Sequence, residues 1–223
     1  MADRLSRMGY AVLRFDYRGT GDSYGDDQDV CLRDWTDDVL LAHQELRFRS
    51  GVDDCIWLGM RLGATLAVQA ASSAPIGLRR MVLWEPVFDG KQYLADLRAS
   101  HIANLAVALG VHAQGDPRKR IADLTAFQDE ACGFALPGNF RAELSQLSPS
   151  SLPCANPQIS LAVLSDPKTS IWQAAASWSA CQDQSVKQIA TEHGIVWTSE
   201  TMDEGNLVPG QTIVALAKAV EWM

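Results

Sequence analysis

The stretch that decides the fold is Cys55–Ala64, which reads C-I-W-L-G-M-R-L-G-A. It begins with four apolar residues, which are typical of a buried strand, and the alanine-rich run that follows is typical of a helix. Gly59 and Gly63 flank the turn between the two elements, and because glycine has no Cβ atom they allow the two backbones to approach closely. We therefore predict a sharp, strained turn that projects the side chain of Arg61 over the sheet.

The rest of the chain alternates between strand-like and helix-like segments. Upstream, Tyr10–Asp16 is a short β-rich run that ends in the glycine turn D-Y-R-G-T-G-D-S at Asp16–Ser23, and Asp34–Arg47 has apolar residues at helical spacing. Downstream, we expect strands at Arg80–Trp84, Ile159–Leu164 and Gly194–Ser199, and helices at Ile171–Cys181 and after Pro209. Such alternation predicts an α/β fold with a mostly parallel sheet flanked by helices.

The pattern breaks between Phe88 and about Pro153, a segment that is largely helical with no clear strand. We therefore expect one domain in three parts: a first core part at 1–87, a helical lid at 88–153 and a second core part at 154–223. A lid of this kind shapes substrate entry. Most of its apolar residues are expected to pack, and a minority to line a pocket for an apolar or acyl group; they include Tyr93, Leu94, Leu97, Ile102, Leu105 and Leu109.

These motifs resemble those of the α/β-hydrolases. The strand, G-x-x-x-G turn and helix have the layout of a nucleophile elbow, and Asp16–Ser23 resembles the turn after the fourth strand of that fold. The chain is most similar to the exosortase A system-associated hydrolases, within the serine aminopeptidase-like branch, through Gly9–Ser23, the elbow and L-W-E-P-V-F-D-G-K-Q-Y-L at Leu83–Leu94. The resemblance spans about Gly9–Leu97. It implies hydrolysis of an acyl or related bond in bacterial exopolysaccharide and protein-sorting systems, with no defined substrate.

The catalytic triad that the resemblance implies is incomplete. The nucleophile position in the elbow Gly59-Met60-Arg61-Leu62-Gly63 holds Arg61, and a protonated guanidinium cannot attack a carbonyl carbon. The base should lie in the loop Glu200–Pro209, which contains no histidine and offers Asp203, Glu204 and Asn206 as polar candidates. The four histidines lie elsewhere and are interpreted as surface or packing residues; they are His43, His101, His112 and His193.

The acid of the triad has one candidate, Asp166, which lies near the end of the strand expected at Ile159–Leu164. It is either a retained acid or a turn former before Pro167. The resemblance implies that the N–H of Leu62 forms half of an oxyanion hole. The other half would belong to a segment upstream of the first helix, and the chain starts inside that helix.

Arg61 has a candidate partner in Glu85, which follows the neighbouring strand. An unpaired buried guanidinium is costly, so we expect Arg61 to pair with Glu85, or with Asp166 or Glu204. In one interpretation the pair only fills the vacated catalytic site. In the other, Arg61 clamps a carboxylate or phosphate ligand with two parallel hydrogen bonds.

In the fold that the resemblance implies, a third strand lies between Tyr10–Asp16 and Cys55–Leu58, so we expect a fold whose N-terminal strands are missing. A gap in a parallel sheet leaves backbone groups unpaired. Four explanations are open: the two strands close up, another segment fills the gap, the start codon is wrongly placed, or a homodimer completes the sheet.

The composition excludes several classes of protein. A formal net charge of -8 and a pI of about 4.9 argue against nucleic acid as a partner, because phosphate binding needs a basic surface. Five scattered cysteines contain no C-x-x-C pair, so we expect no disulfide framework, no metal site and a cytoplasmic location. No apolar run is long enough for a membrane span. We expect no cofactor and a small-molecule ligand.

Three functional hypotheses remain. The first is a non-hydrolytic member of the resembled family that binds a small acyl or saccharide-linked ligand or acts as an accessory protein. The second is an active hydrolase or acyltransferase with an unusual site, in which Asp166 or Glu204 acts with a water molecule. The third is a structural or interaction protein of polysaccharide assembly with a vacated pocket. Arg61 favours the first and the third.

Overall fold

A four-stranded parallel sheet lies at the centre of the computed structural model, which describes residues 1–108, 130–154, 156–183, 185–192 and 210–221. The order is β1-β2-β5-β6, with β1 at Cys55–Met60, β2 at Leu78–Trp84, β5 at Ser160–Ser165 and β6 at Val186–Ala190. The α/β fold and the strands expected from Arg80 and from Ile159 are therefore confirmed. Met60 lies opposite Trp84, and Trp84 opposite Leu164. The carboxyl ends of these strands are level, so the residues after them meet at one edge.

The side chains of the two central strands alternate between two apolar cores, as the period of two along a strand requires. Met81, Leu83, Leu161 and Val163 belong to one core, which includes residues of α2 (Leu32–Ser50), α3 (Leu62–Ala71) and α7 (Ser170–Ala180). Val82, Trp84, Ala162 and Leu164 belong to the other core, with α8 (Gly210–Glu221) and residues of α1 (Ala2–Arg7). Both faces of the sheet are covered, which explains why β2 and β5 are continuous apolar runs.

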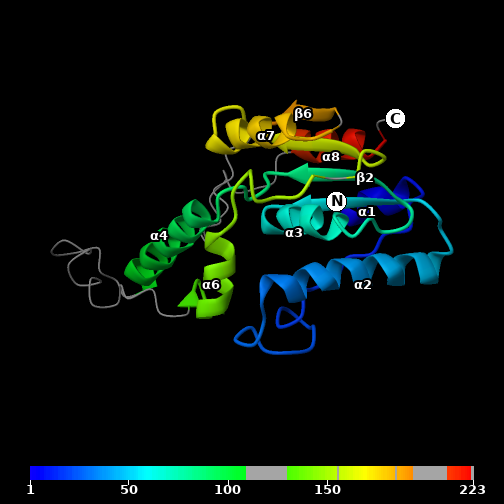
Figure 1. Cartoon of the computed structure of the whole chain (residues 1–223). Helices are drawn as coiled ribbons and strands as arrows, with labels where there is room; N and C mark the ends of the chain where they lie inside the picture. The colour runs from blue at the N-terminus through cyan, green and yellow to red at the C-terminus, as the bar shows by residue number, and fades with distance from the viewer. Residues whose placement is uncertain (109–129, 155, 184, 193–209, 222–223) are drawn as a thin grey trace.

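The segment expected to form a lid contains α4 (Gly90–Ala108), α6 (Gly138–Ser145) and a hairpin of β3 (Glu130–Ala131) and β4 (Phe134–Ala135). Figure 1 shows α4 and α6 together at the left of the sheet. The expectation of no clear strand in this segment was wrong, because two-residue strands around Cys132-Gly133 are too short to show a periodic pattern. Gly90 is required where α4 starts, since a Cβ atom there would lie 1.6 Å from the carbonyl oxygen of Leu144 in α6.

Tyr10–Asp16 does not form the expected strand. A strand needs a neighbouring backbone to bond with, and among the described residues no strand pairs with this segment. Tyr10, Val12, Leu13 and Phe15 remain exposed. In the described sheet β1 is an edge strand. Tyr10–Asp16 and Cys55–Leu58 have therefore not closed up into a strand pair.

The last strand expected, Gly194–Ser199, lies outside the described residues. On the side away from β2, β5 pairs with β6, which we did not predict from the sequence. Its residues alternate between half-buried and exposed and include Lys187 and Gln188, so it lacks the apolar run on which our predictions depended. The expected helices are confirmed: α2 contains 34–47, α7 covers most of 171–181, and α8 begins just after Pro209.

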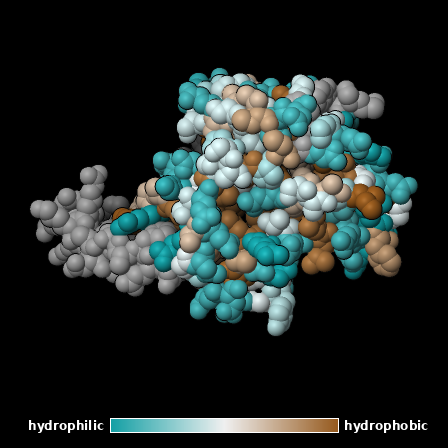
Figure 2. All heavy atoms as spheres, viewed as in Figure 1, coloured by the Kyte–Doolittle hydropathy of each residue, from teal (hydrophilic) through white to brown (hydrophobic). Residues whose placement is uncertain are grey.

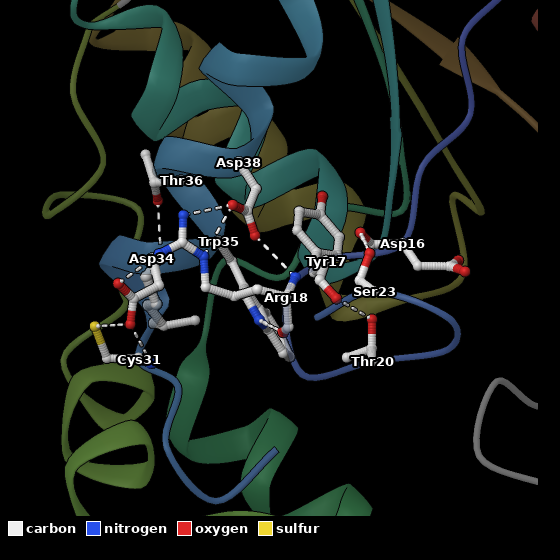
Figure 3. A network of polar contacts seen from close by, with 11 residues as sticks. Asp16, Tyr17, Arg18, Thr20, Ser23, Cys31, Asp34, Trp35, Thr36 and Asp38 are labelled. Carbon is white, nitrogen blue, oxygen red and sulfur yellow. Dashed lines mark hydrogen bonds and ion pairs between the residues drawn. The ribbon is translucent and has the colours of Figure 1, made fainter. Parts of the chain in front are cut away.

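The glycine turn after Asp16 is held by local hydrogen bonds (Figure 3). The hydroxyl of Ser23 donates to the carbonyl oxygen of Asp16 at 2.6 Å, and that of Thr20 donates to the carbonyl oxygen of Tyr17 at 2.7 Å. Ser23 therefore satisfies the backbone of its own turn.

Candidate functional site

The elbow between β1 and α3 is built as the sequence predicts. Arg61 has φ 52° and ψ −127°, a left-handed conformation that strains any residue with a Cβ atom. Its N–H donates to the carbonyl oxygen of Trp84 at 2.9 Å, and its carbonyl accepts the N–H of Ala64 at 3.0 Å. These bonds tie the turn to β2 on one side and to α3 on the other, which fixes the direction of the Arg61 side chain.

The two glycines of the elbow are not equivalent. A Cβ atom at Gly59 would lie 2.5 Å from the Cα atom of Ala64, so the strand and the helix could not approach as they do. A Cβ atom at Gly63 would have the hydroxyl of Tyr17 as its nearest neighbour, at 3.4 Å, which is close to an ordinary contact. The close approach expected of both glycines is thus required only at Gly59.

The structure brings Arg61 and Glu85 together. The Nη1 atom of Arg61 lies 3.8 Å from Oε2 of Glu85 and donates to the Glu85 carbonyl oxygen at 3.4 Å. The Arg61 side chain is 18% exposed, whereas that of Glu85 is 2% exposed. Glu85 is also left-handed, with φ 49°. Two strained residues that follow neighbouring strands therefore form one charge pair at the carboxyl edge of the sheet.

Glu85 also links this pair to the end of β5. Its Oε1 atom accepts the N–H of Asp166 at 2.7 Å, and its own N–H donates to the carbonyl oxygen of Leu164 at 2.8 Å. Both bonds are buried, so the carboxylate is fixed between two strand ends. Glu204, the other acid proposed for Arg61, lies outside the described residues, as do Asp203 and Asn206.

Asp166 forms a turn. Its Oδ1 atom accepts the N–H of Lys168 at 2.9 Å, and its carbonyl oxygen accepts the N–H of Thr169 at 3.0 Å and the Thr169 hydroxyl at 2.8 Å. This is the pattern of an aspartate that turns the chain into a helix, here α7. The contacts thus account for Asp166 as a turn former; its role as a retained acid stays a prediction.

Burial and charge act on the Arg61 guanidinium in opposite directions. Burial lowers the pKa of Arg61, while the negative charge of Glu85 raises it. The Tyr93 ring lies with its centroid 6.0 Å from Cζ of Arg61. Burial raises the pKa of Tyr93, and the cation opposes that shift. Arg61 remains a cation, because arginine stays protonated at any pH that a folded protein reaches.

A cavity of about 370 Å³, which we call the lid pocket, opens beside the elbow. Leu62, half-buried at the start of α3, and Tyr93 connect it to the Arg61 pair. Met60, by contrast, is 46% exposed and does not line the pocket. Of the lid residues expected to line a pocket, Tyr93 and Leu97 do so, while the side chain of Leu105 and residue Leu109 lie outside the described part. The lining that sequence reasoning missed comes from distant segments and includes Trp35, Cys132, Phe134, Leu136 and Phe140.

The two histidines that the structure describes are bonded away from the elbow. His43 is buried, with Nε2 2.9 Å from the carbonyl oxygen of Ile76 and Nδ1 accepting the indole N–H of Trp57 at 3.2 Å. Nδ1 of His101 accepts the N–H of Cys132 at 3.1 Å. His112 and His193 lie outside the described residues.

Within the described ranges, no group of three histidine, cysteine, aspartate or glutamate side chains could hold a metal ion. None of the described helices is long and apolar enough to cross a membrane. The first N–H groups of α3, that of Leu62 included, have no acceptor within their own helix. Such N–H groups favour negative charge, and here they lie beside the Arg61–Glu85 pair.

Comparison with known proteins places this geometry in context. A family model described as serine aminopeptidase, S33, matches residues 1–192. A search of curated proteins finds no match.

Several solved structures share the fold. One comes from work on LipS and LipT, two metagenome-derived lipolytic enzymes, with 14% identity, coverage of 99% of this chain and 84% of that one, and a TM-score of 0.62. A putative hydrolase from Agrobacterium vitis shares 16% identity, and Est1E from Butyrivibrio proteoclasticus, with ferulic acid bound, shares 14%. The match to each of these two structures covers 93% of this chain and 74% of the other chain, with a TM-score of 0.54.

Proposed function

This chain belongs to the serine aminopeptidase family of α/β-hydrolases, and we propose that it binds a small acyl ligand through a carboxylate without hydrolysing it. One observation carries the proposal: Arg61 occupies the strained elbow position, where its guanidinium is paired with buried Glu85. A guanidinium has donors and no lone pair to attack with. The position from which a hydroxyl would attack a carbonyl carbon therefore presents a cation.

The exposure of Arg61 supports a ligand there: its side chain is 18% exposed, and Nη1 lies 3.4 and 3.8 Å from two oxygen atoms of Glu85. Charge-assisted hydrogen bonds between arginine and a carboxylate are usually about 2.7–2.9 Å long. Oε1 of Glu85 is held by the N–H of Asp166, and a ligand carboxylate that approaches the guanidinium in its own plane would form bonds of this shorter kind.

The size and lining of the lid pocket are evidence for an acyl chain attached to that carboxylate. Its volume of about 370 Å³ lies within the usual range for small-molecule sites, about 300–1,000 Å³. Tyr93 contributes to the pocket lining and also faces Arg61. A ligand whose carboxylate meets Arg61 can therefore place its apolar chain against Leu97, Trp35 and Phe140.

A titration with saturated alkyl carboxylates of increasing chain length tests the proposal, with calorimetry and the intrinsic tryptophan fluorescence as readouts. We expect the affinity to rise about fourfold per methylene until the pocket is full, from about 0.8 kcal/mol per buried methylene. The Arg61→Lys variant should bind more weakly, because an ammonium cannot form two parallel bonds. The matched control is Arg79→Ala, which removes an exposed arginine paired with Asp54.

The Arg61→Ala variant leaves Glu85 buried without its cation, which is destabilising, so it is combined with Glu85→Gln. Carboxylate binding that is unchanged in this double variant would overturn the proposal. The same proteins are assayed with ester and thioester substrates, for which we expect no turnover. Turnover that persists without Arg61 and is lost in Asp166→Ala would instead support an active hydrolase or acyltransferase.

The biological setting is a further part of the proposal. We propose an accessory role in bacterial exopolysaccharide or exosortase systems, which rests on the resemblance of Gly9–Leu97, and a cytoplasmic location, which rests on the scattered cysteines. We also propose that two copies associate along the edge of β1, because that strand has no neighbour on its outer side in the described sheet.

A further inference from the structure

A groove of about 860 Å³ runs along α2, on the other side of the loop that borders the lid pocket. One wall is a stripe of α2 residues spaced alternately by four and three positions, from Asp34 and Asp38 through Leu41 to Glu45 and Phe48. Residues with this spacing lie on one face of a helix. The other wall is the loop between Phe15 and Val30. We call this feature the α2 groove.

The floor of the α2 groove is held in place by Arg18 (Figure 3). Its Nε and Nη2 atoms both donate to Oδ1 of Asp38, at 2.9 and 2.6 Å, and Nη1 donates to Asp34 at 3.3 Å. The indole N–H of Trp35 donates to the Arg18 carbonyl oxygen at 3.0 Å. The loop is therefore fixed against α2, and the charge of Arg18 is already neutralised within the groove.

Large apolar side chains of the α2 groove face water. Tyr24 is 96% exposed, Phe48 85% and Leu41 55%. Figure 2 shows apolar atoms interrupting the hydrophilic surface in the region of α2. Three such residues around one concave surface, unlike a single exposed leucine, are typical of an interaction site.

The charges of the groove specify the chemistry of the partner. Among the described residues that line the groove, Arg18 is the one basic residue, whereas six are acidic. Asp34 and Asp38 are bonded to Arg18, and Glu45 pairs with Arg49 on the next turn of α2. The loop wall adds the acidic side chains Asp16, Asp26 and Asp29, which give the groove a surplus of negative charge.

We propose that the α2 groove docks a basic amphipathic helix of a partner protein. Its apolar face would cover Leu41, Phe48 and Tyr24, and its lysine or arginine residues would face the carboxylates of the loop wall. A helix fits because the groove runs beside α2, and helices recognise apolar grooves through anchors spaced by three and four residues. This role is independent of Arg61 and the lid pocket.

The probe is a fluorescently labelled helical peptide of about 14 residues, made of leucine and lysine in an amphipathic order and followed by fluorescence anisotropy. We expect saturable binding that Leu41→Lys and Phe48→Lys each weaken about tenfold, because each removes an apolar anchor and repels the peptide. The matched control is Ile76→Lys, which alters an apolar residue that is 77% exposed and does not line the groove.

A peptide of the same composition in scrambled order separates specific docking from attraction to an acidic protein. The proposal predicts that the scrambled peptide binds at least tenfold more weakly. Equal binding of both peptides, or equal losses in Phe48→Lys and Ile76→Lys, would overturn it. So would a dimer in sedimentation equilibrium that Phe48→Lys abolishes, since a second copy would then occupy the groove. Carboxylate binding at the lid pocket should be unchanged in Phe48→Lys, because Phe48 does not line that pocket. The two proposals can therefore fail independently of each other.

Discussion

Arg61 shows how one residue type sets the chemistry of a strained backbone turn. The left-handed conformation of the elbow is present, so the strain that would present a nucleophile is still stored, and it now presents a cation. The charge is tolerated because Glu85 lies beside it, and Glu85 is itself fixed by the N–H of Asp166. Arg61, Glu85 and Asp166 follow three different strands, and each contacts the next.

His43 gives a prediction for the dependence of stability on pH. Burial lowers the pKa of His43, an effect that its bond to the carbonyl oxygen of Ile76 opposes and the charge of Arg47 reinforces. Its pKa is therefore lower in the folded protein than in the unfolded chain. Its contribution to stability is fully present above the unfolded pKa, about 6.5, and is lost as the pH falls toward the folded value.

We accordingly expect the free energy of unfolding to decrease as the pH falls below about 6.5, and to do so less steeply in His43→Gln. Glutamine can keep a donor for Ile76 but does not titrate. Urea unfolding of both proteins across this pH range measures the difference. Parallel curves would show that His43 does not carry the pH dependence.

At the scale of elements, the β1–α3 junction distinguishes its two glycines. Gly59→Ala should destabilise the protein by about 1–3 kcal/mol, because its Cβ atom would meet the backbone of Ala64 at 2.5 Å and force β1 and α3 apart. Gly63→Ala is the matched control. It lies in the first turn of α3 with its nearest neighbour at 3.4 Å, and alanine favours a helix by about 1 kcal/mol. Urea denaturation of the two variants should give opposite signs; equal losses would contradict the assigned role of Gly59.

The edge elements were the hardest to predict. Tyr10–Asp16 has the composition of a strand and is not one, whereas β6 has polar residues and pairs with β5. Strand formation depends on a partner backbone more than on the residues themselves. The same dependence explains the hairpin around Cys132, whose strands are too short for any pattern.

At the scale of the whole molecule, the open edge of β1 leads to a prediction on assembly. We expect sedimentation equilibrium to show a dimer, because an unpaired strand edge in a parallel sheet favours pairing with another chain. Val12→Pro, in the exposed segment Tyr10–Asp16, tests whether that segment takes part, since proline removes a backbone donor. A monomer at every protein concentration would contradict the expectation.

What the sequence determined by itself was the α/β architecture and the elbow with arginine at its centre, because these follow from local apolar runs, glycine spacing and the identity of residue 61. The neighbourhood of Arg61 and Glu85 was also predictable, because parallel strands end at the same edge. Only the tertiary structure decided that Asp166 turns the chain into α7, that Trp35 and Phe140 line the lid pocket with Tyr93, and that a groove opens along α2. Each of these depends on segments distant in the chain, whose packing no local pattern encodes.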